Sequence, residues 1–338
     1  MHIVLTSINA PNEALRIIAD GAKQAGFQFI VIGDTKSPAD FSLDGCRFLD
    51  VAAQLKTGLA FAQSCPTRHY ARKNIGYLLA IAERAPLILE TDDDNIPRPD
   101  FFGARHRHVE ASAIRESRWI NVYRYFSDVQ IWPRGLPLEF VQQPAPDFES
   151  LAVERLDCPI QQGLADENPD VDAVYRLLLP LPQSFRSDRR VALGQGAWCP
   201  FNSQNTTWWP ETYPLLYLPA YCSFRMTDIW RSFVAQRIAW ENDWHILFHE
   251  PTVYQERNEH SLIKDFADEV PGYLNNDRIR KTLEDTPLRK GTAHMLDNLA
   301  RCYEALVKLD VIGKDELPLL NAWISDLNDI SEGRSGTK

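Results

Sequence analysis

Three consecutive aspartates, Asp92 to Asp94, follow the apolar run Pro86 to Leu89 after two further residues. Alternate side chains of an extended backbone share a face, so Asp92 and Asp94 are expected to point the same way, about 7 Å apart. Carboxylate oxygens select hard ions such as Mg²⁺ or Mn²⁺, and this spacing suits an ion that carries a nucleoside diphosphate. A turn or a helix N-cap would explain the aspartates without a metal. The triple run at the exit of a buried strand favours a contact with metal or nucleotide.

Two histidines could complete a metal site with these aspartates. His260 closes segment 255–260, which also offers Arg257 as a ligand for phosphate, and His249 lies just after a strand predicted at 244–248. Neutral imidazole is a common metal ligand. A structural role explains a lone histidine more often than a metal does, so the sequence leaves both histidines open.

A basic segment precedes the aspartates. Residues 68–76 place Arg68, Arg72 and Lys73 near the start of a predicted helix. Backbone N–H groups and cationic side chains at a helix N-terminus can clamp a diphosphate, so Arg72 and Lys73 are candidates for this contact. A solvated basic surface is the alternative.

Alternating strands and helices are predicted to position these residues. The expected elements are a strand at 3–7, a helix at 12–25, a strand at 27–33, a helix at 72–84 and a strand at 87–90. This alternation predicts a parallel sheet with right-handed crossovers. Ligands of such sheets bind at the carboxyl ends of the strands, where Ser7, Asp34 and the three aspartates fall.

Two later segments offer further candidates. Segment 194–209 is polar, aromatic and glycine-marked, which is typical of loops that wall a sugar or nucleotide site, and it contains Asn202 and Asn205. An ordinary surface loop explains it equally well. Asp228 begins a helix predicted at 228–240, where it either caps the helix or acts as a general base toward an acceptor hydroxyl.

The rest of the chain is expected to frame these segments. Residues 131–182 are rich in proline and aromatic residues, which predicts loops and short strands that cover the sheet. From residue 275 onward the pattern is helical.

The composition limits the class of protein. The 338 residues carry a net charge of −10, which argues against a general nucleic-acid binder. Six scattered cysteines without metal-finger spacing favour reduced thiols in a cytoplasmic protein. We find no signal peptide and no apolar window of ~20 residues, so no transmembrane segment is expected.

The aspartate run together with residues 71–77 resembles the nucleotide-sugar site of GT-A glycosyltransferases. More narrowly, the chain is similar to the STELLO-like family, a relative of the reversibly glycosylated polypeptides (UDP-arabinopyranose mutases). Further segments that carry the resemblance are 163–166 (Gly-Leu-Ala-Asp), 168–177, 200–206 and 227–232.

The resemblance implies a GT-A-like α/β fold, with a mostly parallel central sheet flanked by helices. We expect a nucleotide-sugar-binding catalytic domain at 1–270 and a C-terminal helical extension at 271–338.

The resemblance also implies roles for the candidate residues. Asp92 and Asp94 would hold Mn²⁺ or Mg²⁺ against the diphosphate, and Asp228 would be the catalytic base. Asp34 would lie near the nucleotide base, and residues 202–205 would face the donor sugar or the acceptor. The expected contacts with the nucleotide sugar are Ser7, Asp34, Arg72, Lys73, Asp92, Asp93, Asn202, Asn205 and Arg257.

The implied activity is metal-dependent, inverting transfer of a sugar from a nucleotide-diphosphate donor, with UDP-sugars favoured. The acceptor would be a hydroxyl of a glycan, lipid-linked glycan or protein, as in surface-polysaccharide or glycan synthesis. Plant STELLO proteins are membrane-anchored and this chain shows no anchor, so a cytoplasmic location, or a peripheral one at the inner membrane surface, is expected instead of a Golgi role.

Three alternatives stay open. One is a nucleotide-sugar (pyranose/furanose) mutase on the same fold, and another is a non-catalytic scaffold that binds a nucleotide sugar. A nucleotidyltransferase also uses acidic metal ligands, but it usually has a glycine-rich loop near the first strand, which residues 6–14 lack.

Overall fold

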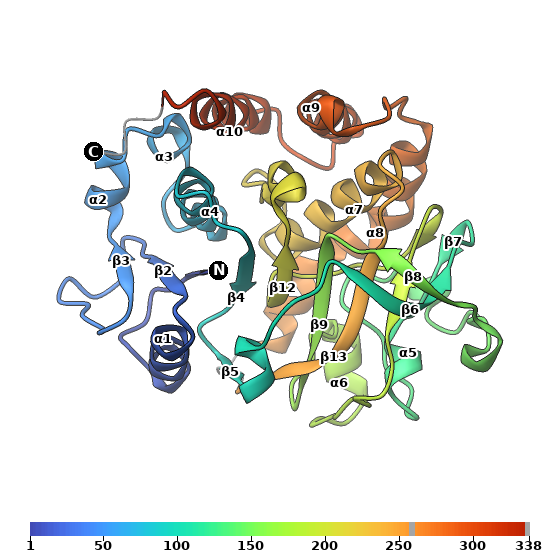
Figure 1. Cartoon of the computed structure of the whole chain (residues 1–338). Helices are drawn as coiled ribbons and strands as arrows, with labels where there is room; N and C mark the ends of the chain where they lie inside the picture. The colour runs from blue at the N-terminus through green and yellow to red at the C-terminus, as the bar shows by residue number, and fades with distance from the viewer. Residues whose placement is uncertain (257–260, 335–338) are drawn as a thin grey trace.

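The computed structural model describes residues 1–256 and 261–334 (Figure 1). Within them, one eleven-stranded sheet runs through the molecule in the order β3-β2-β1-β4-β12-β9-β13-β10-β6-β8, with β5 paired to β13. The strands are β1 (His2–Thr6), β2 (Gln28–Ile32), β3 (Arg47–Leu49), β4 (Ile88–Thr91), β5 (Asn95–Pro97), β6 (His108–Ile114), β7 (Arg118–Trp119), β8 (Val153–Asp157), β9 (Ile160–Asp166), β10 (Val191–Leu193), β11 (Ala197–Trp198), β12 (Asn205–Trp208) and β13 (Ile246–Gln255). The small strands β7 and β11 pair with each other.

Helices flank this sheet, and the last three of them form the C-terminal part of the described chain. They are α1 (Glu13–Ala25), α2 (Val51–Lys56), α3 (Ala60–Ser64), α4 (Lys73–Ala82), α5 (Tyr123–Phe126), α6 (Ala173–Leu178), α7 (Thr227–Trp240), α8 (Leu262–Asp285), α9 (Met295–Lys308) and α10 (Glu316–Ser331). The predicted class, an α/β protein with a large central sheet flanked by helices, is confirmed.

The N-terminal part of the sheet is parallel, as the alternation of elements predicts. β1 pairs in parallel with β2 on one side and with β4 on the other. The side chain of Asn12 caps α1 by accepting a hydrogen bond from the Leu15 N–H, and Gly26 ends the helix at φ 69°, a left-handed conformation that glycine adopts without strain. Because these three strands run parallel, the carboxyl ends of β1, β2 and β4 meet at one edge of the sheet.

The direction of the sheet changes at β12. This strand is antiparallel to β4, and Asn205 lies opposite Thr91 (Figure 1). Because the two strands run in opposite directions, the start of β12 lies beside the end of β4. Residues 202–205 are thereby brought next to the aspartate run, more than a hundred residues away in sequence.

The middle of the chain supplies more of the sheet than the sequence predicts. β9 lies in the region expected to form loops and short strands that cover the sheet, yet it is a fully buried seven-residue strand inside the sheet, between β12 and β13. β13 extends to Gln255, beyond the strand expected at 244–248, and α8 begins at Leu262, before the expected start of the helical region.

The C-terminal helices share the main hydrophobic core. Leu299, Leu320 and Trp323 belong to the same buried cluster as Phe61 and Tyr217. Figure 1 shows α10 beside α3, and the Asp326 carboxylate accepts the backbone N–H groups of Ala60 and Phe61 at 2.8 Å each. The boundary expected after residue 270 falls inside α8, and the division into two domains stays a prediction.

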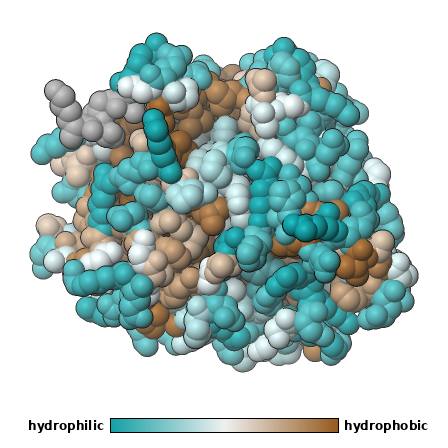
Figure 2. All heavy atoms as spheres, in the orientation of Figure 1, coloured by the Kyte–Doolittle hydropathy of each residue, from teal (hydrophilic) through white to brown (hydrophobic). Residues whose placement is uncertain are grey.

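The surface agrees with the acidic, polar composition. Hydrophilic side chains cover most of the face drawn in Figure 2, with apolar side chains gathered between them. None of the helices in residues 1–256 and 261–334 combines the length and apolar character that crossing a bilayer requires.

Candidate active site

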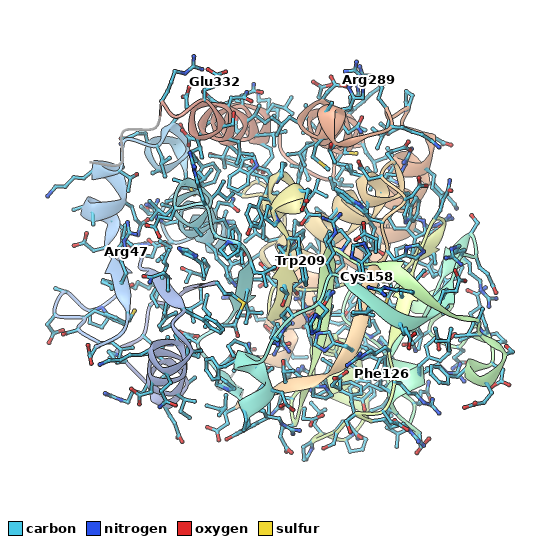
Figure 3. The ribbon with its side chains drawn as sticks, in the orientation of Figure 1. Arg47, Phe126, Cys158, Trp209, Arg289 and Glu332 are labelled. Atoms are coloured by element: carbon cyan, nitrogen blue, oxygen red, sulfur yellow. The ribbon has the colours of Figure 1, made fainter. Side chains whose placement is uncertain are left out.

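The candidate site lies where the carboxyl ends of β1, β2 and β4 meet the start of β12. Trp209, labelled in Figure 3, directly follows β12 and so marks the end of that strand remote from the site. Ser7 and Asp34 are buried just beyond β1 and β2, and the aspartate run leaves β4 between them and β12.

Asp93 is turned toward β1. Its Oδ2 accepts hydrogen bonds from the Ser7 hydroxyl and from the Asn9 side-chain amide, the latter at 2.9 Å. Its carbonyl accepts the Asn12 amide at 2.6 Å. Ser7 and Asp93 are thus brought together as expected, and their contact with a nucleotide stays a prediction.

Asp92 points in another direction, toward a buried lysine. Its Oδ1 accepts the Tyr70 hydroxyl at 2.6 Å and the Lys73 ammonium at 3.1 Å. The same ammonium lies 2.7 Å from the Thr91 carbonyl and 3.0 Å from the Ser203 carbonyl. Burial raises the pKa of Asp92, and the charge of Lys73 and the Tyr70 hydrogen bond oppose that rise. Lys73 is therefore a fixed counter-ion of Asp92, because backbone carbonyls of β4 and of the loop before β12 hold its ammonium in place.

Asp94 has weaker compensation. Its Oδ2 accepts the Gln255 side-chain amide at 2.9 Å, and no cation forms an ion pair with it among the described residues. Burial together with the neighbouring charges of Asp92 and Asp93 raises the pKa of Asp94 to about 7. The cluster therefore carries an uncompensated negative charge that a bound cation would stabilise.

Three carboxylate oxygens of the run accept no hydrogen bond from another residue within residues 1–256 and 261–334. They are Oδ2 of Asp92, Oδ1 of Asp93 and Oδ1 of Asp94. The same residues contain no cluster of three or more His, Cys, Asp or Glu side chains suited to a metal. Two carboxylates nevertheless fit Mg²⁺ or Mn²⁺, which often keep several waters and take further ligands from substrate phosphates.

The structure does not place His249 with the aspartates. His249 lies in β13 against Glu250 and Arg105, and burial, helped by the Arg105 charge, lowers its pKa to about 4. Its hydrogen bond goes to the Glu250 carbonyl, so the expected ligation by His249 finds no support. His260 and Arg257 lie outside the described residues.

Arg72 does not face the site. Its side chain is 1% exposed, and the guanidinium binds the Gln54 side chain and the Cys65 carbonyl. The expectation that Arg72 contacts a diphosphate is therefore corrected. The sequence places it one residue before Lys73, and successive residues at a helix start point in different directions.

Asp34 and the two asparagines are also engaged by the protein. Asp34 accepts the backbone N–H groups of Thr35 at 2.6 Å and His69 at 3.0 Å, which ties the end of β2 to the segment before α4. Asn205 is 2% exposed and bonds to Leu164 of β9 and Thr252 of β13, so its side chain joins β12 to these two strands. The expected contact of Asn205 with a sugar is corrected, because that amide is occupied inside the sheet.

Asn202 belongs to a second charged cluster, around Asp228. Arg134 binds both oxygens of Asp228 at 3.0 Å and both oxygens of Asp170 at 2.8 Å. The Asn202 amide donates to Asp170 at 2.9 Å. Burial opposes the ionisation of Asp170, but the Arg134 guanidinium outweighs it and lowers the pKa of Asp170 to about 2.

The two clusters are joined by hydroxyl groups. The Ser203 Oγ lies 2.7 Å from the Tyr70 hydroxyl, which binds Asp92, and 3.4 Å from Oδ2 of Asp228. Asp228, the expected base, is therefore close to the aspartate run. Arg134 competes with any substrate hydroxyl for the same carboxylate oxygens.

Several residues of the site had no role in the prediction from sequence. Tyr70, Asp170 and Gln255 lie in segments that the sequence singled out, but nothing in the spacing identified those side chains. Arg134 lies in the proline-rich region expected to form covering loops, and no sequence signal pointed to it.

Comparisons with known proteins show which proteins this chain resembles. Residues 225–333 match the family model of the STELLO glycosyltransferases. The chain is 28% identical, over 96% of its length, to the probable glycosyltransferases STELLO2 and STELLO1 of Arabidopsis thaliana. It spans 44% of each of these relatives, so it covers less than half of their length.

The crystal structure of a mycobacterial protein can be superposed on 81% of this chain and on 74% of the mycobacterial chain. The TM-score is 0.41 and the sequence identity is 12%, so this likeness supports no conclusion about the protein. The family match and the two plant relatives confirm the predicted resemblance of this chain to the STELLO-like glycosyltransferase family.

Proposed function

We propose that this protein is a metal-dependent glycosyltransferase of the GT-A type, which transfers a sugar from a nucleoside-diphosphate donor to an acceptor hydroxyl. The observation that carries the proposal is the pair of available oxygens on Asp92 and Asp94, with the pKa of Asp94 raised to about 7 by burial and like charge. A divalent cation bridging to a diphosphate would compensate that charge. The family resemblance supports sugar transfer over other reactions of phosphates.

The protein's own residues have distinct tasks in this proposal. Asp92 and Asp94 hold Mn²⁺ or Mg²⁺, which would stabilise the charge that develops on the departing nucleoside diphosphate. Lys73 favours the ionised form of Asp92 and fixes β4 against the loop before β12. Ser7, at the end of β1, and Asp93, after β4, lie where we place the nucleotide, for which UDP is favoured.

Asp228 is our proposed base for an inverting transfer. It is buried near the aspartate run, and a carboxylate in hydrogen-bond reach of an acceptor hydroxyl can take its proton as the glycosidic bond forms. In the structure Arg134 occupies both of its oxygens, so the acceptor would have to displace or share one of these hydrogen bonds. Glycan, lipid-linked glycan and protein hydroxyls all fit this chemistry.

Donor binding is tested most directly by thermal stability. Mn²⁺ together with UDP or a UDP-sugar, each at about 100 times its dissociation constant, is expected to stabilise the fold by roughly 2.7 kcal/mol. The stabilisation should fall sharply when EDTA replaces Mn²⁺, because the diphosphate then meets bare carboxylates. Equal stabilisation in EDTA would contradict the metal role, and no response to any nucleotide sugar would contradict the donor site.

The base is tested by Asp228→Asn. Loss of general base catalysis is expected to reduce kcat by roughly 10²- to 10⁴-fold, whereas the thermal shift with Mn²⁺ and UDP should remain. Asp326→Asn is a matched control, since it changes a buried carboxylate whose hydrogen bonds go to α3. Wild-type kcat in the Asp228 variant would remove this residue from the mechanism.

A further inference from the structure

The hydroxyl of Tyr70 lies among three polar groups of the candidate site. It is 2.6 Å from Oδ1 of Asp92, 2.7 Å from Oγ of Ser203 and 2.8 Å from Nζ of Lys73. Tyr70 begins the short 3₁₀ helix Tyr70–Arg72, and Lys73 begins α4. Residues three apart in such a turn lie on one face, which explains why both side chains reach the same carboxylate.

The proton inventory fixes the direction of these hydrogen bonds. An ammonium group has no acceptor, so Lys73 donates to the Tyr70 oxygen. The single proton of Tyr70 is then free for Asp92 or Ser203. A carboxylate is the stronger acceptor and lies at the shorter distance, so Tyr70 donates to Asp92.

These two donors occupy one side of the Asp92 carboxylate. Tyr70 and Lys73 both bind Oδ1, and Oδ2 accepts no hydrogen bond within the described part of the chain. Asp94 shows the same division, with Gln255 on Oδ2. Asp93 likewise receives the Ser7 and Asn9 hydrogen bonds on one oxygen, Oδ2, which is held toward β1.

We infer that Tyr70 is a positioning residue, which fixes the Asp92 carboxylate so that Oδ2 faces the bound metal. The inference rests on the proposed metal-dependent function. Lys73 supplies charge, but the three N–H donors of its ammonium are shared among four oxygens within 3.1 Å, and Asp92 is the most distant of them. The planar, rigid tyrosine brings its hydroxyl to one place, and Ser203 holds that hydroxyl from the other side. Carboxylates that bind metals are commonly oriented by such hydrogen bonds.

Tyr70→Phe tests this role, because it removes only the hydroxyl. The affinity for Mn²⁺ is measured by its electron paramagnetic resonance signal in the presence of saturating UDP, and the affinity for UDP is measured separately in EDTA. We expect the dissociation constant for Mn²⁺ to rise about 10- to 100-fold, the usual cost of losing a hydrogen bond to a metal ligand. Metal-free binding of UDP should be unchanged, which a general defect in folding would not allow.

Tyr77→Phe is the matched control. The Tyr77 hydroxyl also donates to a buried carboxylate, that of Glu90 in the same strand as the aspartate run, but Glu90 binds Arg231 and not the proposed metal. This variant should keep the wild-type affinity for Mn²⁺.

Three outcomes would overturn the inference, and they differ in what else they affect. A Tyr70→Phe variant that binds Mn²⁺ within twofold of wild type would overturn the positioning role and leave the metal site intact. Wild-type protein that fails to bind Mn²⁺ with UDP would overturn the proposed function and this inference together. If Tyr70→Phe does not fold, Ser203→Ala replaces it. Ser203→Ala removes the hydroxyl that holds the Tyr70 hydroxyl from the other side. It should weaken Mn²⁺ binding without changing UDP binding in EDTA. Wild-type affinity for Mn²⁺ in this variant would again overturn the inference.

Discussion

Asp94→Ala is expected to abolish metal-dependent sugar transfer while the fold survives. The variant removes one of the two carboxylates that we propose as metal ligands, and the other, Asp92, is already paired with Lys73. A single carboxylate holds Mg²⁺ or Mn²⁺ weakly, so kcat/KM should fall at least 10²-fold, a magnitude typical of losing a group that stabilises transition-state charge. The thermal shift produced by Mn²⁺ with UDP should disappear in parallel.

The stability of this variant separates a functional role from a structural one. Burial and like charge raise the pKa of Asp94 to about 7, so the ionised carboxylate is disfavoured by the fold at neutral pH. Removing it should leave the melting temperature without metal unchanged or slightly raised, because repulsion from Asp92 and Asp93 is relieved. A large fall in melting temperature would mean that Asp94 supports the fold.

Asp44→Asn is the control for loss of negative charge. Asp44 is exposed and pairs with Lys23 in the last turn of α1. The opposite end of that helix, at Asn12, contacts the aspartate run, and the helix length separates the two by roughly 16 Å. The control should keep both turnover and the response to Mn²⁺. Turnover by Asp94→Ala at the wild-type rate, or in the presence of EDTA, would contradict the metal role.

Arg231→Met is expected to give a large loss of stability. Arg231 and Glu90 form a fully buried ion pair with two hydrogen bonds, at 2.8 and 3.0 Å, and Trp208 and Tyr77 also donate to the carboxylate. Removing the guanidinium leaves a buried carboxylate without its counter-charge. The free energy of unfolding should fall by about 3–5 kcal/mol, measured by urea denaturation.

A second variant separates the pair from its packing. In Glu90→Gln/Arg231→Met no charge remains, so the double variant should be more stable than Arg231→Met alone. Arg115→Met removes one partner of an exposed pair of similar geometry, with Glu154 at 2.8 and 2.9 Å, and should destabilise far less. Equal losses for Arg231→Met and Arg115→Met, or strictly additive effects in the double variant, would contradict this account.

The first third of the fold was predictable because its signals are local. The strand at 3–7, the helix at 12–25 and the strand at 87–90 correspond to β1, α1 and β4 within two residues at each end. Periodic burial of apolar residues, together with Asn12 and Gly26 as caps, defines these elements without reference to the rest of the chain. β9 was missed because it lies among prolines and aromatic residues, and only its pairing with β12 and β13 makes it a strand.

The candidate site was predicted in part for the same reason. The position of Ser7, Asp34 and the aspartates follows from strand order alone, since parallel strands end at one edge of the sheet. Arg72 and Asn205 were assigned to the ligand because of residue type, and the structure uses both inside the protein. The type of a residue limits what its side chain can bind, but the direction of the side chain depends on the backbone conformation.

Local signals along the chain are enough to predict the class of fold, the acidic run at the end of a buried strand and the resemblance to STELLO-like glycosyltransferases. The contacts within the site depend on the folded chain: Asp92 faces Tyr70 and Lys73, Asp93 faces β1, and Arg134 joins Asp170 to Asp228. Hydrophobic periodicity and helix caps act over a few residues, whereas these contacts join residues as far as 94 positions apart. They form only when the sheet assembles and β12 pairs antiparallel with β4.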